Sequence, residues 1–509
     1  MSPDASAAGD GDVVLALDQG TSSTKGIAVD RAGQVVARVT ISIGQRAPRP
    51  GWVEQDAAEI LASVVTGIGD LASSLPDGAR VAAIGLSTQR ESAVAWDAAT
   101  GEPVGPMLGW QDRRTTTLCR DLIASGHADA VRRSTGLPID PMFSAPKFAW
   151  ILDEVDPDRA RSAAGGIHLG TVDAWLVERL TGVQSIEAGN ASRTGLMNLT
   201  TRTWDPQLLA LYRIPAASLP EISASNRILP VVTLGGLAAP ISGVLGDSHA
   251  ALYGHGVASP GLSKVTLGTG SSIMGLVRAA GDPALDDGLV STLAWADPEP
   301  RLAFEGNILS TGATLVWLAG LLGITVDGLV ELAESDPESA VDLVPAFAGL
   351  GAPWWDARAR ALMVGFDLST TRAGVARAAL DSIALQIGDV LDRADTRTGR
   401  RQEILVDGGP SVNDRLVQRL ADLTQRTVRR PQRAGVSAWG AALMAGRSAG
   451  VWDSGPGAHP PTDVFGPVMD ADTASFRRDR WHEAVRLARH HSRSANRRRS
   501  TTDDNGPLT

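Results

Sequence analysis

This chain has a single cysteine among its 509 residues, Cys119, which excludes an intramolecular disulfide and a cysteine-based metal centre. It also has no excess of positive charge, because 47 lysines and arginines stand against 57 aspartates and glutamates, a net charge of −10. That balance disfavours a nucleic-acid surface, since binding to phosphate backbones needs a concentrated positive field. The arginine cluster at 497–499 lies in a polar tail, where a solvated segment is expected.

Segments that would anchor the chain in a membrane or direct its export are also lacking. The longest apolar run, residues 313–325, is too short to cross a bilayer. The N-terminal sequence MSPDASAAGDGD has neither the basic region nor the apolar core of a signal peptide. We therefore expect a cytoplasmic protein without a membrane span.

Several motifs of phosphate and nucleophile chemistry are missing. There is no GxxxxGK[ST] loop, no GxGxxG after a strand, and no HRD or DFG motif. No Cys/His cluster has the spacing of zinc ligands, and no GxSxG elbow is present. These absences argue against P-loop, dinucleotide-binding and protein-kinase folds, and against zinc proteins and serine hydrolases.

What is present is typical of a globular protein, with 43% hydrophobic and 20% charged residues. The length exceeds one ordinary core, so two large domains are expected. Near the N-terminus the strand-like runs VVLALD, KGIAVD and QVVARVTIS precede the helix-like segment DAAEILASVVTGIGDLASSL and a further strand, RVAAIGLS. A meander that leads through a helix into another strand predicts an α/β domain with a mixed sheet.

The first hairpin has a polar turn, DQGTSSTK, that runs from Asp18 to Lys25. Its small residues suit a tight turn, but they also suit a phosphate cradle built from backbone N–H groups and hydroxyls. Residues 264–277, KVTLGTGSSIMGLV, repeat its pattern near the middle of the chain. This recurrence predicts two related domains that each contribute a hairpin to one central cleft.

A third glycine-rich segment, DGGPSVND at 407–414, follows a short strand-like run. A strand, a glycine pair and a helix start together present free N–H groups to an anion, although an ordinary strand-to-helix turn has the same pattern. If these segments face one cleft, they favour phosphoryl transfer from a nucleotide. Hydroxyls and amides hold phosphates, while carboxylates hold Mg²⁺ and accept a proton.

Segments over nearly the whole chain carry a resemblance to one family: DQGTSSTK, STQRES, GWQDRRT, GTVDAWL, GNASRT, LGDSHAALYG, TLGTGSS, VPAFAGLGAPWWD, VDGGPSVN and GVSAWGAALMAG. With them the chain resembles the FGGY family of carbohydrate kinases, and within it looks most like the glycerol kinases. The resemblance implies an α/β fold of two actin-like, RNase-H-like domains with mixed sheets around a central cleft. It implies a disordered N-terminus (1–11), a domain with the acceptor and part of the phosphate site (12–253), a nucleotide domain (254–490) and a disordered tail (491–509).

The resemblance also implies ATP and Mg²⁺ as cofactors and gives roles to single residues. Asp247 matches the catalytic base, which takes the proton of the hydroxyl being phosphorylated. Asp18 and Asp247 match the carboxylates at the metal, and Val316 stands near the nucleotide base where a polar residue is common. Lys25 stands where arginine is common, which keeps the charge but loses the bidentate fork. Positions around the phosphates and the ADP moiety are matched by Thr21, Ser22, Ser23, Lys25, Gly268, Thr269, Gly312, Gly408, Gly409 and Asn413.

The acceptor pocket of the family is matched only in part. Arg90 and Glu91 match residues that hydrogen-bond the hydroxyls of glycerol, and Trp110 matches an indole that covers its carbon chain. A surface ion pair is the alternative for Arg90 and Glu91. Where glycerol kinases have tyrosine, glutamine and phenylalanine, this chain has Met142, Ser248 and Ser272. These changes predict a roomier pocket that is less dedicated to a three-carbon triol.

We therefore expect an ATP-dependent kinase that phosphorylates a hydroxyl of glycerol or a related polyol or sugar, with Asp247 as general base. A kinase for a ketose such as xylulose would share the mechanism and differ in the pocket. A non-catalytic sugar- or ATP-binding regulator is a third hypothesis, but such a sensor does not need a general base. Similar enzymes are dimers or tetramers, so a homo-oligomer is expected, and the cleft predicts domain closure on substrate.

Overall fold

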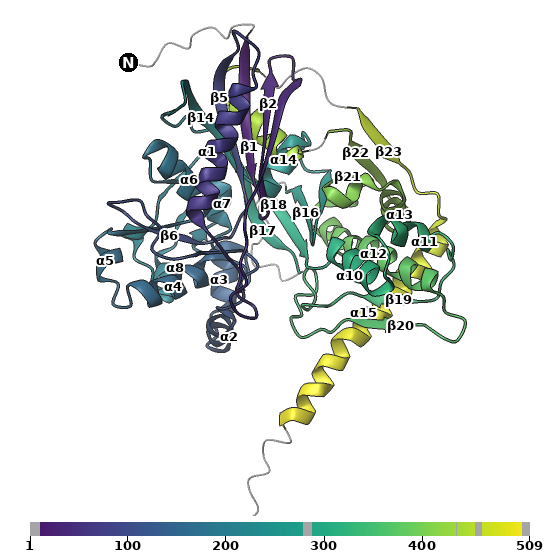
Figure 1. The fold of residues 1–509 in the computed structure, drawn as a ribbon. Coiled ribbons are helices and arrows are strands. Elements are labelled where there is room, and N and C mark those ends of the chain that lie inside the picture. The colour runs from purple at the N-terminus through teal and green to yellow at the C-terminus, as the bar shows by residue number, and fades with distance from the viewer. Residues whose placement is uncertain (1–10, 278–287, 434, 454–460, 501–509) are drawn as a thin grey trace, which may run out of the picture.

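The computed structural model describes residues 11–277, 288–433, 435–453 and 461–500 (Figure 1). Of the expected disordered N-terminus, residues 1–10 lie outside the described residues, as do residues 501–509 of the expected tail. The last helix, α15 (Ala471–Ser500), continues through residues 491–500, which we had expected to belong to that tail. The segment contains neither glycine nor proline, so no helix-breaking residue stops it earlier.

The first sheet contains the polar hairpin near the N-terminus. β1 (Asp12–Gln19) pairs antiparallel with β2 (Ser23–Asp30), and β2 pairs with β3 (Val35–Ser42). The chain then passes through α1 (Ala57–Ser73), and β5 (Arg80–Thr88) returns parallel to β1. The sheet is therefore mixed, as the meander predicts. Its full order is β13 (Val231–Leu234), β14 (Leu237–Gly246), β5, β1, β2 and β3.

Strand β1 is buried on both faces, which explains its nearly continuous apolar sequence. Leu15 belongs to the set that packs against α1, whereas Val14 belongs to the alternate set that packs against α14 (Val436–Ser448). Helix α14 lies within 254–490, so a helix from the second half of the chain covers the first sheet (Figure 1). The packing is close, because a Cβ on Gly85 would lie 2.4 Å from a backbone oxygen of this helix.

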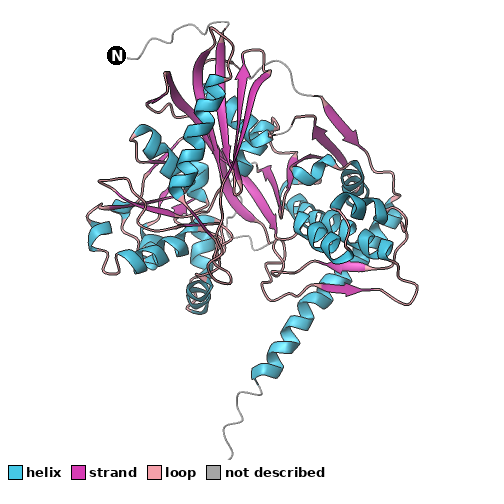
Figure 2. Cartoon of the chain, in the orientation of Figure 1, coloured by secondary structure: helices cyan, strands magenta, loops and turns pink. Residues whose placement is uncertain are grey.

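The second sheet repeats the order of the first around a second hairpin, with β17 as an additional edge strand. Strands and helices lie together in both halves of the molecule (Figure 2). β15 (Ser263–Leu267) and β16 (Ser271–Leu276) are antiparallel, and β21 (Glu403–Asp407) runs parallel to β15, as β5 does to β1. The two related domains expected from the sequence repeat are thus confirmed. The full order is β17 (Val290–Asp297), β18 (Glu299–Ile308), β16, β15, β21, β22 (Thr427–Pro431) and β23 (Thr462–Phe465). Its apolar core is shared with α10 (Gly312–Leu322), α11 (Val326–Ala333), α12 (Arg372–Thr398), α13 (Asp414–Thr424) and α15.

The hairpin of β17 and β18 joins the second sheet to the first domain. It packs against α7 (Ala188–Ser192), where the hydroxyls of Ser192 and Thr292 share a hydrogen bond of 2.8 Å. Leu293 of β17 extends the apolar core of the first domain. Helix α9 (Asp247–Gly254) follows β14 directly and packs against α14 and against β15 and β16. The chain is therefore held together at this junction by packing as well as by the connection itself.

A lobe of short elements lies beside the first sheet in space (Figure 1), and all of them except the short strand β4, which precedes α1, lie between β5 and β13 in the sequence. Its other helices are α2 (Thr116–Ala124), α3 (Ala128–Thr135), α4 (Ser144–Val155), α5 (Ala160–Ala163), α6 (Val172–Thr181) and α8 (Pro206–Tyr212). Short strands pair two by two: β4 (Glu54–Gln55) with β7 (Met107–Leu108), β6 (Val94–Asp97) with β8 (Ile167–Gly170), β9 (Ser185–Glu187) with β12 (Glu221–Ser223), and β10 (Met197–Asn198) with β11 (Thr203–Trp204). In the second domain, β19 (Asp342–Val344) pairs with β20 (Leu362–Val364).

No helix in the described part of the chain is by itself long and apolar enough to cross a membrane. Taken together, α10 and α11 reach that length and composition, with a bend of 89° between them. Both helices contribute buried residues to the core of the second domain.

Candidate active site

The turn between β1 and β2 is tight, and its polar side chains remain accessible. Asp18 and Lys25 are cross-strand partners, and the N–H of Gly20 closes the turn by donating to the carbonyl of Ser23 at 3.0 Å. Ser22 and Lys25 are exposed, and the neighbouring hydroxyl of Thr21 is half-buried. The two interpretations of this segment are therefore compatible, because a turn of this shape leaves hydroxyls and a cation facing solvent. Its phosphate-binding role stays a prediction.

The carboxylate of Asp18 lies near other acids at the junction of the two domains. Burial raises its pKa to about 6, and Asp247 and Asp407 act in the same direction, against the Ser87 hydroxyl and Lys25. The Ser87 hydroxyl donates to Oδ1 of Asp18 at 2.7 Å. A cation would relieve the repulsion, and Mg²⁺ commonly binds one or two carboxylates together with water and substrate phosphates. The described residues contain no cluster of three or more His, Cys, Asp or Glu side chains that could hold a metal ion, and the metal-binding role of Asp18 stays a prediction.

Asp247, the expected general base, is the first residue of α9. Its Oδ1 accepts hydrogen bonds from the backbone N–H of Ser248 at 2.6 Å and from Nε of Arg90 at 2.9 Å. The side chain is 39% exposed, and no hydrogen bond from the described residues reaches its Oδ2. One oxygen is thus fixed by the protein, and the other is free to accept a proton.

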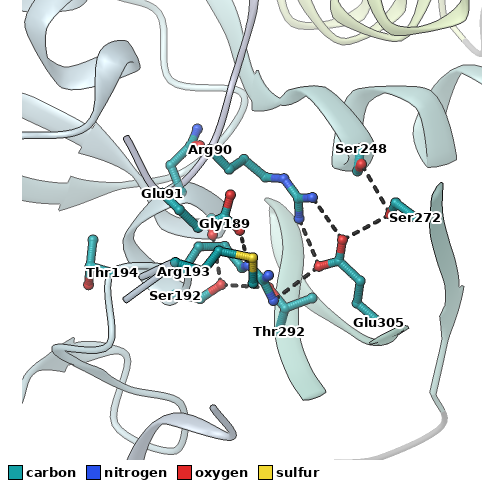
Figure 3. Close-up of polar contacts among 12 residues, drawn as sticks. Arg90, Glu91, Gly189, Ser192, Arg193, Thr194, Ser248, Ser272, Thr292 and Glu305 are labelled. Carbon is teal, nitrogen blue, oxygen red and sulfur yellow. Dashed lines mark hydrogen bonds and ion pairs between the residues drawn. The ribbon is translucent and has the colours of Figure 1, made fainter. Parts of the chain in front are cut away.

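Arg90 belongs to a buried ion-pair network that spans both domains. Its terminal nitrogens donate to the two carboxylate oxygens of Glu305 on β18, at 2.9 and 2.7 Å (Figure 3). Arg193, which follows α7, lies 3.0 Å from Glu305 and 2.6 Å from the carboxylate of Glu91. Arg90 and Glu91 are each 5% exposed, and each pairs with a distant partner. The alternative of a surface ion pair between them is wrong.

Glu305 balances the charge of this network. Although burial raises its pKa, the guanidinium groups of Arg193 and Arg90 outweigh that effect and hold the pKa well below its usual range. The carboxylate therefore stays ionised, and it fixes the plane of the Arg90 guanidinium through two parallel hydrogen bonds. Because Arg90 also holds Asp247, a residue of the second domain orients the expected base of the first.

Ser248 and Ser272, two of the three residues that differ from the glycerol-kinase pattern, contact each other in the structure. The hydroxyl of Ser248 donates to that of Ser272 at 3.2 Å, and Ser272 donates to Oε1 of Glu305 at 2.9 Å (Figure 3). Together with Arg90 and Asp247, these residues close a ring of hydrogen bonds. Two small hydroxyl side chains thus stand side by side where larger groups were expected from the family pattern.

Trp110 and Met142, which are expected to contact the acceptor, lie together in an apolar environment. Both belong to one small apolar cluster, in which Met142 is 6% exposed. The backbone N–H of Trp110 donates to the Ser92 hydroxyl, and its indole N–H donates to the Thr21 hydroxyl, both at 3.1 Å. The indole therefore connects the acceptor residues to the polar turn between β1 and β2.

The glycines expected around ADP are positions of close backbone approach. Gly408 has a φ of 95°, and a Cβ there would lie 1.9 Å from the carbonyl oxygen of Leu267. A Cβ on Gly312 would lie 2.6 Å from the carbonyl oxygen of Gly268, which accepts the N–H of Gly312 at 2.9 Å. The carbonyl of Thr269 accepts two further N–H groups at the start of α10. The segments at the ends of β15 and β21 and the start of α10 are thus held together.

The remaining residues expected near the nucleotide differ in whether they already interact with the rest of the protein. Val316 is 64% exposed on α10, and a Cβ on Gly409 would meet no atom within 4 Å. The side-chain oxygen of Asn413 caps α13 by accepting the N–H groups of Arg415 and Leu416 at 3.1 and 3.3 Å. Asn413 therefore already has a structural role, whereas Val316 and Gly409 present open surface.

Some charged residues of this region were not expected from the sequence. Glu305, Arg193 and Lys147 are all fully buried, and Asp407 accepts a hydrogen bond or ion pair from His255 at 2.6 Å. Each charge stands in an apolar or small-residue segment, such as RLAFEGN around Glu305. Such a charge signals a buried ion pair, because an unpaired one is costly. The sequence does not say which residue is the partner.

Two family models match the chain. The N-terminal domain of the FGGY family of carbohydrate kinases matches residues 13–254, and the C-terminal domain matches residues 263–449. Among curated proteins, a glycerol kinase from Aromatoleum aromaticum is 42% identical over 493 residues, covering 94% of this chain and 98% of its own length. A glycerol kinase from Acinetobacter baylyi is 42% identical over 491 residues, covering 94% of this chain and 99% of its own.

Solved structures share the fold over nearly its whole length. The glycerol kinase of Plasmodium falciparum with ADP superimposes with a TM-score of 0.85 at 28% identity, covering 95% of this chain and 99% of that one. A xylulose kinase from Lactobacillus acidophilus gives a TM-score of 0.83 at 22% identity, covering 95% and 98%. At that identity the second similarity shows the fold alone.

Proposed function

Because this chain belongs to the FGGY family of carbohydrate kinases, we propose that it transfers the γ-phosphoryl group of Mg-ATP to a hydroxyl of glycerol or a related polyol. The family membership confirms the two-domain fold and an ATP-dependent kinase with an alcohol group as acceptor. The observation that carries the finer proposal is the setting of Asp247. One of its oxygens is held by Arg90 and the other is open, beside residues that suit an alcohol.

Asp247 acts as general base in this proposal. Its free Oδ2 takes the proton of the acceptor hydroxyl as the hydroxyl oxygen attacks the γ-phosphorus. The bond between the γ-phosphorus and the β,γ-bridging oxygen breaks, and ADP leaves. Arg90 keeps the carboxylate in place through Oδ1.

The donor side would be held by the two polar hairpins. Thr21, Ser22, Ser23 and Lys25 supply hydroxyls and a cation at the first hairpin. Gly268 and Thr269 of the second hairpin, Gly312 at the start of α10, and Gly408 and Gly409 after β21 supply backbone without bulky side chains on the other side. Asp18 and Asp247 would hold Mg²⁺, which when bound neutralises charge on the transferring phosphoryl group. The raised pKa of Asp18 supports this assignment, since a cation there relieves the repulsion among the acids.

The acceptor would lie against Glu91, Trp110 and Met142. The carboxylate of Glu91 can accept hydrogen bonds from hydroxyls, and the indole can cover a carbon chain. The curated relatives named glycerol kinase make glycerol the leading acceptor. Ser248 and Ser272 favour a second candidate, a longer polyol or a ketose such as xylulose, because their hydroxyls add hydrogen-bonding groups and little bulk.

Two further properties belong to the same proposal. We place the enzyme in the cytoplasm, where its nucleotide donor is available, and we propose that it forms a homo-oligomer, as a dimer or tetramer. Size-exclusion chromatography with light scattering measures the second property directly. A monomer at micromolar concentration would contradict it.

A coupled assay of ADP release tests the activity. With Mg-ATP and glycerol, erythritol, xylitol or xylulose as acceptor, we expect the largest kcat/KM for glycerol and measurable rates for at least one larger acceptor. No ADP release with any of the four, combined with tight binding of one of them by calorimetry, would instead support a non-catalytic regulator.

The variant Asp247→Asn tests the assigned base. It keeps the size and one hydrogen-bond acceptor of the side chain but has no basic oxygen, so kcat should fall by about 10³-fold or more. Circular dichroism and the melting temperature check that the variant is folded. Retained activity in Asp247→Asn would remove Asp247 from the mechanism.

A further inference from the structure

A buried lysine behind the acceptor region touches none of the groups that would bind substrate, yet it contacts the backbone of two acceptor residues. Lys147 of α4 is 0% exposed. Its ammonium group donates to the carbonyl of Met142 at 2.5 Å and to the carbonyl of Glu91 at 3.1 Å. Among the described residues no carboxylate forms an ion pair with it. The lysine therefore places a buried charge against two backbone oxygens.

Burying this ammonium group costs free energy. A buried ammonium without a counter-ion loses its hydration, and an apolar side chain would fill the same space without that loss. The backbone oxygens compensate in part, because a charged donor forms stronger hydrogen bonds than a neutral one. The contact is thus better explained by what it holds in place than by packing alone.

What it holds is a strained residue. Glu91 has a φ of 63°, which lies in the left-handed region that non-glycine residues rarely adopt. Its carbonyl accepts a second hydrogen bond from the hydroxyl of Ser144 at 3.0 Å, and its carboxylate is held by Arg193. Lys147 and Ser144 therefore anchor the backbone of Glu91, while Arg193 anchors its side chain.

We propose that Lys147 is a positioning residue for the acceptor. Its ammonium group holds the carbonyls of both Glu91 and Met142, and it thereby sets the spacing between the Glu91 carboxylate and the apolar side chains of Met142 and Trp110. The inference rests on the proposed function, because it assumes that the acceptor lies between these groups. Lys147 itself stays behind the pocket and acts only through the two residues it holds.

The charge of Lys147 gives this role a pH dependence. Burial lowers the pKa of Lys147 to about 7, while Glu91, Asp112, Asp140 and Cys119 act in the opposite direction. As the pH rises through 7, the ammonium group loses its charge, and its hydrogen bonds to the two carbonyls weaken. The acceptor should then bind less well, whereas the nucleotide, on the other side of the junction, should not be affected.

The test compares Lys147→Met, Lys147→Arg and Ser144→Ala with the wild type, using glycerol and Mg-ATP. Lys147→Met removes both hydrogen bonds, so the KM for glycerol should rise about tenfold or more while the KM for ATP changes less than about twofold. Ser144→Ala removes only one donor to Glu91, so we expect a smaller rise, of about two- to fivefold. Lys147→Arg keeps the charge at all pH values, so it should flatten the rise of the glycerol KM between pH 6.5 and about 8.

The kinetic results for these variants either support or overturn the positioning role of Lys147. Equal rises of both KM values in Lys147→Met, or a fall in kcat alone, would overturn the inference, as would an unchanged glycerol KM in Ser144→Ala together with an unchanged pH profile in Lys147→Arg. If Lys147→Met does not fold, the other two variants decide. A wild type that phosphorylates none of the acceptors defeats the proposed function and this inference together, whereas an active wild type with unaffected variants defeats only the inference.

Discussion

Arg90 shows how much of this site depends on one side chain. Its two terminal nitrogens donate hydrogen bonds to the two carboxylate oxygens of Glu305 in the second domain, and its Nε donates to Asp247. A lysine could not replace it, because a point charge lacks the planar fork that meets one carboxylate in parallel while a third donor reaches another. The base is therefore oriented by a group whose own orientation is set by the other domain.

The serine pair at the acceptor region gives a prediction about specificity. Ser272→Phe replaces a hydroxyl that bonds to Glu305 with a ring that fills space beside Ser248. We expect the ratio of kcat/KM for the largest accepted polyol to that for glycerol to fall about tenfold, because the longer substrate loses room and a hydrogen-bonding partner. Parallel rates on purified protein with glycerol and xylitol measure the ratio.

Ser272→Ala is the matched control, since it removes the hydroxyl and adds no bulk. A fall in both variants would assign the effect to the hydrogen bond, and a fall in the phenylalanine variant alone would assign it to space. Ratios that match the wild type in both would show that this serine does not select the acceptor.

The sequence could predict those site residues that stand in recognisable turns. Asp18 and Lys25 were placed correctly at the two edges of a hairpin, because small residues between apolar runs define a turn locally. Glu305 was missed, although through Arg90 it orients Asp247, the expected base. Its partner Arg90 lies 215 positions away, and nothing in a strand such as RLAFEGN states which distant residue will neutralise the acid.

At the scale of elements, the two hairpins depend on glycines that allow close backbone contact, and Gly408 provides a test. Alanine there would have to adopt a φ of 95° with its Cβ 1.9 Å from the carbonyl of Leu267. We expect Gly408→Ala to lower the free energy of unfolding by about 2 kcal/mol or more and to raise the KM for ATP, because the end of β21 must shift. Thermal melting and steady-state kinetics measure the two effects.

Its neighbour Gly409 is the matched position for stability, since a Cβ there meets no atom within 4 Å. The melting temperature of Gly409→Ala should therefore stay close to that of the wild type. Equal destabilisation in the two variants would mean that the contact with Leu267 is not what requires glycine at Gly408.

Helix α14 marks the limit of sequence prediction at this scale. The strands of the first domain, α1 and the repeated hairpin follow from periodicity and turn residues, and the structure confirms them. The segment 436–448 is apolar nearly all round, which indicates a buried helix but not the sheet it covers. The structure packs it on the first sheet although its sequence neighbours belong to the second.

In the whole molecule, buried polar contacts between the two domains gather at one place. The buried contacts of Arg90 and Arg193 with Glu305, and of Ser192 with Thr292, lie together at the hairpin of β17 and β18. Breaking such buried ion pairs is costly, so this region should stay closed during turnover. Any approach of the two polar hairpins must then be a rotation about it, and that rotation is the motion that would exclude water from the γ-phosphate.

Solution scattering tests this motion. Under the proposed function, the polar hairpins of both domains would hold the donor and Glu91 would lie on the acceptor side. We therefore expect the radius of gyration to fall when ATP and glycerol are added to Asp247→Asn. That variant should bind both ligands without consuming them, which keeps the complex constant during the measurement. Glycerol alone should not produce the change, because its proposed contacts, Glu91, Trp110 and Met142, all belong to the first domain. A scattering profile that is the same with no ligand and with both, at concentrations that saturate binding by calorimetry, would show that the junction holds the domains in one arrangement throughout the reaction.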